Sequence, residues 1–370
     1  MRRGCLRSTG GSGTRTSPPG RFLSMSDKIS LRIGDKAIEH FLSYSIDTDL
    51  YTPADAFRME LSAPETQVEA GMRCEVWVND QRELTGIIDR VTRRVTEHGQ
   101  TLSVEGRDLM GLLVDSCCES FVSVKNKSLR ELAALLLRAV PYINRKAVVY
   151  QSAASGKAKT TTDLLDEPQT ITQIEPGMTV FEVLKAAAVS RGLLFYSLPD
   201  GTLVFGRPKA KGEPAFTLQL TRDGKGNNVI ESELARDISR RWSKITVLGQ
   251  RQGQDSFGAD ATAIRTGASR TDSEISFYKP FVQCSNNDGV SPALMARLLM
   301  EKGRKEGWQY GVTVARHSSN GKNWTVNELA RVTDEVQGLD GVYLIYGRTF
   351  ELDKNLGPTT RLKLGRVGLI

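Results

Sequence analysis

Few residues in this chain have the types and spacing that catalysis requires. The three histidines, His40, His98 and His317, lie in no HExxH or other metal-ligand pattern, and His98 falls in a predicted turn. For each histidine we expect a surface position or a hydrogen-bonded structural role. The sequence has no GxSxG elbow and no Walker A loop. The histidines therefore indicate no catalytic centre.

The cysteines do not indicate a disulfide framework or a metal site. They form no CxxC pair, and an odd number without a secretion signal predicts reduced thiols; they are Cys5, Cys74, Cys117, Cys118 and Cys284. The adjacent Cys117 and Cys118 could form a reactive pair. Buried positions as small apolar residues are the better interpretation.

Two basic motifs and the carboxylates complete the chemical candidates. Gly224-Lys225-Gly226 follows a predicted strand, but Val229 replaces the third glycine of GxGxxG, so we expect a turn. Arg240-Arg241-Trp242 could stack on a nucleic acid, but in a strand it would place Trp242 inward and the arginines at an edge. A glycosidase pair of carboxylates stays open, because nothing in the sequence selects two of them. We therefore predict no catalytic, cofactor-binding or metal-binding residue.

Composition predicts a globular protein with a nearly neutral body. Of the 370 residues, 39% are hydrophobic and 25% charged, and there is no run of 18 apolar residues for a membrane helix. Residues 1–24 hold five arginines and no acids, so the net charge of +7 leaves about +2 (7 − 5) for the rest, which argues against a DNA-binding protein. This leader lacks the apolar region of a signal peptide, and we expect it to be disordered. An upstream start codon before Met25 is one explanation, and a functional basic arm is the alternative.

The elements that position these residues are mostly strands. Residues 25–112 read as short strands broken by turn formers, and in the long hairpin 83–108 apolar and polar residues alternate. Residues 113–209 read as a small α+β domain. Its helix 128–140 and a second helix from Thr179 each have a capping box, and a hairpin with an Asp200-Gly201 turn follows the second helix. The polar segment 152–170 is expected to be an exposed loop.

The third region is also mainly strand. Residues 229–247 are ambiguous, because apolar residues recur every four positions, which suits a helix or a strand. We expect a second β-barrel domain over 210–252 and 308–370, interrupted by an insertion at 253–307 with a Gly- and Ser-rich loop (251–277) and a helix that starts at Ser291-Pro292. Residues 342–366 repeat the plan of 83–108, with an apolar opening, a long alternating strand, a glycine turn and a short return strand.

Several motifs, in a specific order, resemble a known family. SVEGRDLMGLLVDS (103–116) and the capped helix after it resemble the exit of the first domain in Mu-type contractile-phage baseplate hub proteins, a group related to late-control tail proteins and to the start of type VI secretion spike proteins. TVFEVLKAAAVSRGLLFYSLPDGTLVFGRP and NVIESELARDISRRWSKITVLGQ resemble the helix, hairpin and strand pair that lead into the second barrel, which favours strand for 229–247. FYKPFVQCSNND, NWTVNELARVTD, YLIYGRTFELD and GPTTRLKLGR resemble the C-terminal part. The leader 1–24 has no counterpart.

The resemblance implies a fold and a structural role. The fold would be mainly β, with two similar antiparallel β-barrel domains (25–112, and 210–252 with 308–370), the α+β domain at 113–209 and the helical insertion. The implied function is a homotrimeric baseplate hub in the virion, with no enzyme activity and no cofactor. Three chains would form a ring of six barrels between the six-fold tail tube and the trimeric cell-puncturing spike. The tape-measure protein and DNA would pass through the lumen without specific binding.

Other functions stay open at this point. A hub of a contractile secretion system or of a phage-derived bacteriocin would look nearly the same in sequence. A tail-delivered cell-wall hydrolase predicts instead that two carboxylates, or a cysteine and a histidine, converge in a cleft. The chain is expected to assemble in the bacterial cytoplasm, with no membrane insertion of its own.

Overall fold

The computed structural model describes residues 27–62, 67–97, 99–123, 127–150, 173–250, 264–285, 291–353 and 357–369. The predicted leader (1–24) and the loop 152–170 lie outside these residues. The described chain is mainly β, as predicted. Its helices are α1 (Met110–Asp115), α2 (Leu129–Leu136), α4 (Val180–Val189) and α5 (Pro292–Glu306).

The first β region is built from the N-terminal strands. Each shows the alternation of buried and exposed side chains that a sheet with one covered face requires. The strands follow the order β3-β4-β7-β6-β5-β1-β2, all antiparallel. They are β1 (Ile29–Ile33), β2 (Lys36–Ile38), β3 (Ser43–Asp49), β4 (Ala56–Ser62), β5 (Arg73–Val78), β6 (Gln81–Thr96) and β7 (Gly99–Asp108).

The second β region comes mainly from the C-terminal part of the chain. Its strands follow the order β14-β18-β23-β22, and β21 and β13 continue from β22. They are β13 (Phe216–Leu220), β14 (Val229–Arg236), β18 (Trp308–Ala315), β21 (Glu328–Asp334), β22 (Leu339–Asp353) and β23 (Gly357–Gly365), with the small hairpin β19 (Ser318–Ser319) and β20 (Lys322–Asn323). The strand assignment of 229–236 resolves the helix-or-strand ambiguity in favour of strand.

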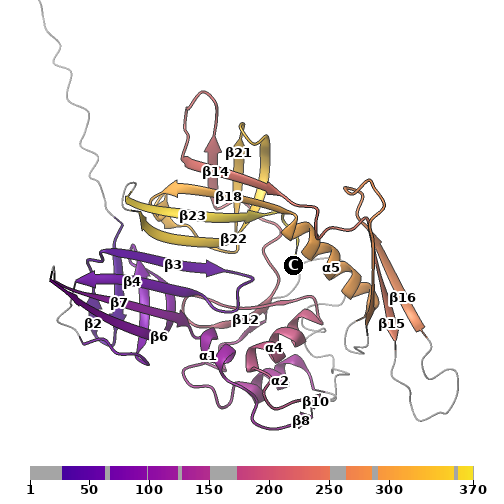
Figure 1. Ribbon diagram of the computed structural model, residues 1–370, viewed down its shortest axis with the longest axis horizontal. Helices are drawn as coiled ribbons and strands as arrows, with labels where there is room; N and C mark the ends of the chain where they lie inside the picture. The colour runs from indigo at the N-terminus through magenta and orange to yellow at the C-terminus, as the bar shows by residue number, and fades with distance from the viewer. Residues whose placement is uncertain are drawn as a thin grey trace, which may run out of the picture.

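The two β regions form one continuous sheet. Residues Gly347–Glu351 of β22 pair with Ser45–Asp49 of β3, so the sheet runs from β14 at the top of Figure 1 through β22 and β3 to β6 and β7. Buried apolar side chains of both regions also belong to one core. Two closed barrels were expected, but the described strands form an open sheet whose edge strands are β14, β13 and β2. The β3–β22 pairing joins the two regions through strand edges that each barrel would have needed to close on itself.

The repeated plan of the sequence is confirmed as two matching hairpins, β6–β7 and β22–β23. Each first strand is long, with 16 and 15 residues. Each carries a β-bulge at the same place, between Ile88 and Arg90 in β6 and between Ile345 and Gly347 in β22. A bulge bends a strand and increases its twist. Both long strands can therefore leave one neighbour and extend beyond it.

The middle region packs helices on small sheets. The predicted capping boxes are confirmed at Ser128–Glu131 and Thr179–Glu182, where side chain and backbone bond in both directions. Helix α2 ends at Leu136, earlier than predicted, and Gly192, which follows α4, has a positive φ of 67°. The strands here are β8 (Val122–Ser123), β9 (Val149–Tyr150), β10 (Gln173–Ile174), β11 (Leu194–Ser197) and β12 (Leu203–Gly206), of which β11 and β12 form the predicted hairpin.

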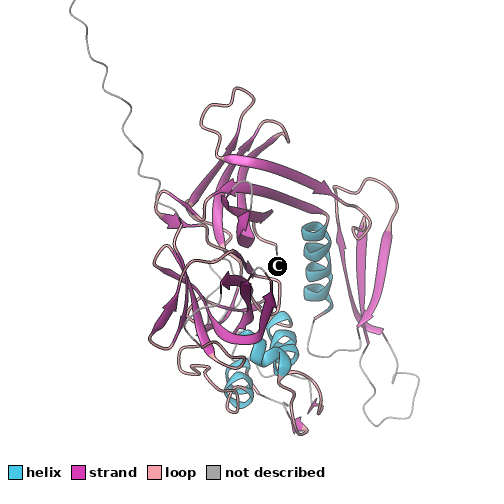
Figure 2. Ribbon diagram, turned by 60° about the vertical axis from the view of Figure 1, so that its left-hand side comes forward, coloured by secondary structure: helices cyan, strands magenta, loops and turns pink. Residues whose placement is uncertain are grey.

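The insertion forms its own layer. Strands β15 (Lys244–Gln250), β16 (Ile264–Thr271) and β17 (Pro280–Ser285) make a separate three-stranded sheet that α5 covers (Figure 2). β15 was expected in the second β domain, but its partners are β16 and β17. Residues 251–277 were expected to be a loop, yet 264–271 form β16; residues 251–263 lie outside the described part. Ser291 caps α5 with Pro292 in the first turn, as predicted.

Candidate functional site

A buried ion pair lies at the seam between the two β regions. Arg348 Nη1 on β22 is 2.5 Å from Glu83 Oε2 on β6, and the two side chains are only 2% and 7% exposed. The guanidinium also donates to the Trp324 carbonyl (2.8 Å) and to Thr48 Oγ1 (2.9 Å), while Asn323 Nδ2 donates to Glu83 Oε1 (2.6 Å). Breaking such a pair leaves a charge buried without compensation, which is costly. The ion pair therefore fixes the position of one region relative to the other.

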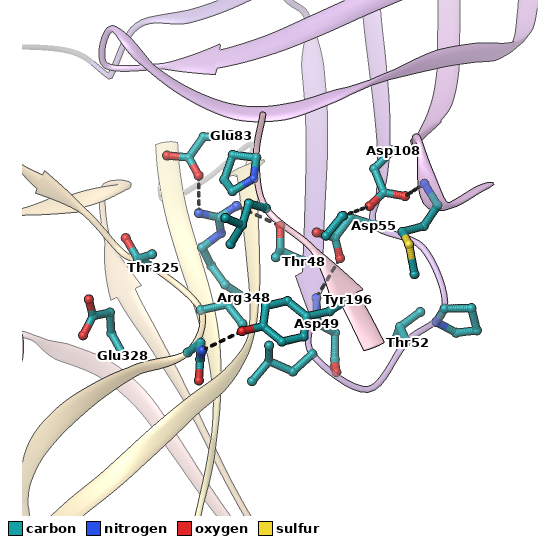
Figure 3. Close-up of a pocket in the computed structure, with 18 residues that line it drawn as sticks. Thr48, Asp49, Thr52, Asp55, Glu83, Asp108, Tyr196, Thr325, Glu328 and Arg348 are labelled. Carbon is teal, nitrogen blue, oxygen red and sulfur yellow. Dashed lines mark hydrogen bonds and ion pairs between the residues drawn. The ribbon is translucent and has the colours of Figure 1, made fainter. Parts of the chain in front are cut away.

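A cavity of about 220 Å³ adjoins this ion pair (Figure 3). Loops and strand ends of the first, middle and second regions line it. Its lining is rich in carboxylates, which are Asp49, Asp55, Glu83, Asp108 and Glu328. A cell-wall hydrolase would need such a convergence of acids, so the state of each carboxylate decides what the site can do.

Two of these carboxylates have strongly raised pKa values. Burial raises the pKa of Asp108 to about 7, although the amide of Met110 (3.1 Å) and the hydroxyl of Ser197 donate to its two oxygens. Burial, and then the charge of Asp108, raise the pKa of Asp55 well above its usual value. Asp55 Oδ1 accepts a bond from the amide of Asp49 at 3.0 Å. A raised pKa keeps the proton on a carboxylate to higher pH, a property that acid–base catalysts share.

The surroundings of the pair favour a structural role. Asp49 is paired with Lys363 at 3.0 Å and Glu328 with Lys209 at 2.5 Å, so these acids are already occupied. The cavity is also smaller than the ~300–1,000 Å³ typical of ligand pockets. Asp108 joins the end of β7 to the start of α1 and to β11 through its hydrogen bonds. Asp108 therefore connects the first and middle regions.

The two described histidines occupy a buried and a surface position. His317 is fully buried; its Nε2 is 2.7 Å from the Tyr44 hydroxyl, and its Nδ1 is 3.2 Å from Thr360 Oγ1. Burial lowers the pKa of His317 to about 4, so the ring is neutral at pH 7. The prediction of a hydrogen-bonded structural histidine is confirmed for His317. His40 is exposed with a φ of 68°, and His98 lies outside the described residues.

The described cysteines and other polar clusters do not form a metal site. Cys74 and Cys118 are buried, whereas Cys117 and Cys284 are exposed free thiols, so the buried interpretation holds for only one of the adjacent pair. Within the described ranges, no three His, Cys, Asp or Glu side chains are arranged to hold a metal ion.

The two basic motifs have structural positions. Gly224-Lys225-Gly226 lies in the turn between β13 and β14. The strand predicted for 240–242 was wrong, because these residues lie in the connection before β15 and Arg241 is buried, but Trp242 packs inward as predicted. Arg241 Nη2 is 2.7 Å from the buried Asp272, where it ties the bend to the insertion. Trp242 stacks on Phe281 at 4.5 Å between ring centroids.

Sequence reasoning did not find the seam residues. A usable signal exists, because Arg348 has the same strand parity as the buried Phe350 and therefore had to face the interior. Glu83 likewise precedes a buried run in β6. A charged residue at an inward strand position indicates a buried partner, but alternation alone does not say which residue that partner is.

Comparisons with known proteins agree with this architecture. Residues 28–108 match the family model of the N-terminal part of the Mu phage baseplate assembly protein GpP-like, and residues 295–368 match a tail protein C-terminal domain. The baseplate hub protein gp44 of Escherichia phage Mu is 24% identical over 365 residues, which is 92% of this chain and 88% of gp44. The chain resembles the Mu-type baseplate hub proteins.

Two solved tail proteins share the fold of this hub-like chain. The tail protein from Neisseria meningitidis MC58 is 28% identical, with a TM-score of 0.78 over 93% of this chain and 98% of that one. The 43 kDa tail protein of prophage MuSo2 from Shewanella oneidensis is 25% identical, with a TM-score of 0.74 over 92% and 98%. These similarities support a structural role in a phage tail baseplate. Among the described residues, the helices lack the length and hydrophobicity needed to span a membrane.

Proposed function

We propose that this protein is the structural hub of a contractile-tail baseplate. Three copies form a ring that joins a six-fold tail tube to a trimeric cell-puncturing spike, and the ring leaves a lumen through which the tape-measure protein and DNA pass. The protein has no catalytic role and needs no cofactor. It acts in the virion after assembly in the host cytoplasm.

The repeated architecture of the two β regions carries this proposal. Both regions have the same hairpin with the same bulge, and both continue it with two further strands, β4 and β3 or β18 and β14. Two similar modules in one chain turn three subunits into six similar faces. We assign the modules to residues 25–112 and to 210–252 with 308–370, and treat each as half of a barrel-like unit that neighbouring modules complete. The middle domain (113–209) and the insertion (253–307) then lie outside the ring of modules.

The rigid seam supports the same role. The Arg348–Glu83 pair and the β3–β22 pairing hold the two modules of one chain at a fixed angle. A ring closes only if that angle is constant from one subunit to the next. The nearly neutral body of about +2 also suits a lumen that a polyanion must pass without sticking.

Native mass spectrometry of the full chain tests the proposal. The expected species is a trimer of three times 40.8 kDa. Negative-stain images should show rings with six-fold features. A stable monomer at high concentration would contradict the proposal, and lysis of purified peptidoglycan by the protein would favour a hydrolase instead.

A further inference from the structure

One edge of β22 is shared by two different strands. Residues Leu339–Ile345 pair with β21, and after the bulge Gly347–Glu351 pair with β3 of the first region. The amide of Leu50 extends this junction with a 2.9 Å bond to the carbonyl of Tyr346. The junction between the two regions is therefore an antiparallel strand pairing that begins at the bulge.

The corresponding edge of β6 is only half used. Its first residues pair with β5, and backbone bonds to residues 71 and 72 continue this edge as far as Ile88. After the bulge, Arg90–Val95 pair with β7 on one side, and no described strand pairs with the other side. Most side chains here are exposed; Val95 is 66% exposed, whereas Phe350, in the matching part of β22, is fully buried.

β14 is the structural counterpart of β3. Ile46 of β3 and Leu234 of β14 each lie opposite an aromatic residue of the next strand, Phe57 and Tyr310 respectively. Both strands run into the same aspartate turn. Asp49 Oδ1 accepts from the amide of Tyr51 at 3.0 Å, and Asp237 Oδ1 accepts from the amide of Ser239 at 2.7 Å.

The outer edge of β14 is also unused. β3 has β4 on one side and β22 on the other, whereas the sheet pairs β14 with β18 alone within the described chain. The residues that follow Asp49 and Asp237 differ in exposure. Leu50, next to the paired edge of β3, is 6% exposed, whereas Ile238, at the end of β14, is 50% exposed. Within the described residues, one chain thus contains one complete junction, β22 with β3. It also presents the two equivalent strands, β6 and β14, each without the corresponding partner.

We infer that Arg90–Val95 of one copy pairs antiparallel with β14 of the next copy and repeats the β22–β3 junction between subunits. Aligning the two bulges gives the register. Arg90, Thr92 and Arg94 occupy the places of Gly347, Thr349 and Glu351, whose partners are Asp49, Asp47 and Ser45. The equivalent positions in β14 and its turn are Asp237, Ala235 and Glu233.

The charges of the two edges fit this register. Arg94 faces Glu233, and Arg90 faces Asp237. The β6 segment carries a further positive charge at Arg93, and β14 carries a further negative charge at Glu231. Opposite charges across a strand pair stabilise it, and like charges destabilise it. Pairing of this arginine-rich edge with itself is therefore disfavoured. The contact is head-to-tail, and such contacts close into a ring when the rotation allows.

Cysteine crosslinking tests the register, and the inference rests on the proposed trimeric ring. In the predicted register Thr92 and Ala235 are directly opposite, within the Cα separation of about 4.4–6.8 Å that a disulfide needs. The variant Thr92→Cys/Ala235→Cys should give covalent dimers and trimers on a non-reducing gel after mild oxidation. The matched control Thr92→Cys/Glu231→Cys displaces one cysteine four residues along the same strand, roughly 13 Å away, and should stay monomeric on the gel. Each single variant controls for the native thiols.

Charge reversal gives an independent readout by native mass spectrometry. Arg94→Glu and Glu233→Arg should each raise the concentration at which trimers dissociate by roughly tenfold or more, about 1.4 kcal/mol. The combined variant should recover trimers. The inference is overturned if the trimer crosslinks only in the control register or not at all, or if the combined charge variant does not restore it. The ring proposal would survive each of these results. A wild-type monomer overturns both.

Discussion

The seam between the two β regions offers a direct test of the architecture. Arg348→Met removes one partner of the buried ion pair and keeps the aliphatic part of the side chain. Glu83 is then left with the amide of Asn323 as its donor, at 2.6 Å. The change also removes the donors to Thr48 and to the Trp324 carbonyl. We expect the free energy of unfolding to fall by about 3–5 kcal/mol, the cost of leaving a buried charge unpaired.

A double-mutant cycle measures how much of this loss belongs to the pair. Urea unfolding, followed by tryptophan fluorescence, gives the free energy of unfolding for wild type, Arg348→Met, Glu83→Gln and the double variant. Once Glu83 is neutral, loss of Arg348 no longer leaves a buried charge. The double variant should therefore be more stable than the sum of the single effects predicts, by about 2 kcal/mol.

A surface ion pair on the same hairpin provides the control. Arg361 and Glu351 pair at 2.7 Å, but the arginine side chain is 65% exposed. Arg361→Met should cost less than about 1 kcal/mol, because water screens exposed pairs. If Arg348→Met costs no more than Arg361→Met, or if the cycle is additive, the buried pair does not hold the regions together and the reasoning is refuted.

Three further predictions concern local features. Burial raises the pKa of Asp108 to about 7, so its proton stabilises the native state at low pH. As the pH rises from about 4 to 7, the free energy of unfolding of wild type, relative to that of Asp108→Asn, should fall by up to about 1.4 kcal/mol per pH unit. A difference between the two proteins that does not change with pH would contradict this. Gly86→Ala places a Cβ 1.9 Å from the Arg107 carbonyl oxygen and should prevent folding or lower the melting temperature strongly, whereas Gly311→Ala, with open space around its Cβ, should change it little. Ser128→Ala removes the cap of α2 and should cost about 1 kcal/mol in urea unfolding, and an unchanged stability would show that the cap is dispensable.

The candidate site shows the limits of sequence reasoning. For His317 we expected a surface position or a hydrogen-bonded structural role, and the structure shows the second, with Tyr44 and Thr360 as partners. Its tyrosine partner is 273 positions away in the chain. The raised pKa values of Asp55 and Asp108 come from burial at the meeting point of three regions. No local pattern encodes that environment, so the carboxylates could not be selected in advance.

Local interactions and side-chain alternation were decided by the sequence alone. The capping boxes at Ser128 and Thr179, the Asp200-Gly201 turn and the two matching hairpins depend on residues a few positions apart, which sequence displays directly. Alternation also set which face of each strand is buried, because successive side chains point to opposite sides.

Only the tertiary structure decided which strand edges meet. Alternation fixes the faces of a strand, but backbone hydrogen bonds along its edges are nearly the same for every residue type. The sequence therefore did not show that β15 would leave the main sheet or that β3 would join β22. Those choices depend on bulges, long-range closure and buried partners such as Arg348 and Glu83, which are 265 residues apart. The edges of β6 and β14 that no described strand occupies are the ones we propose to join one copy to the next.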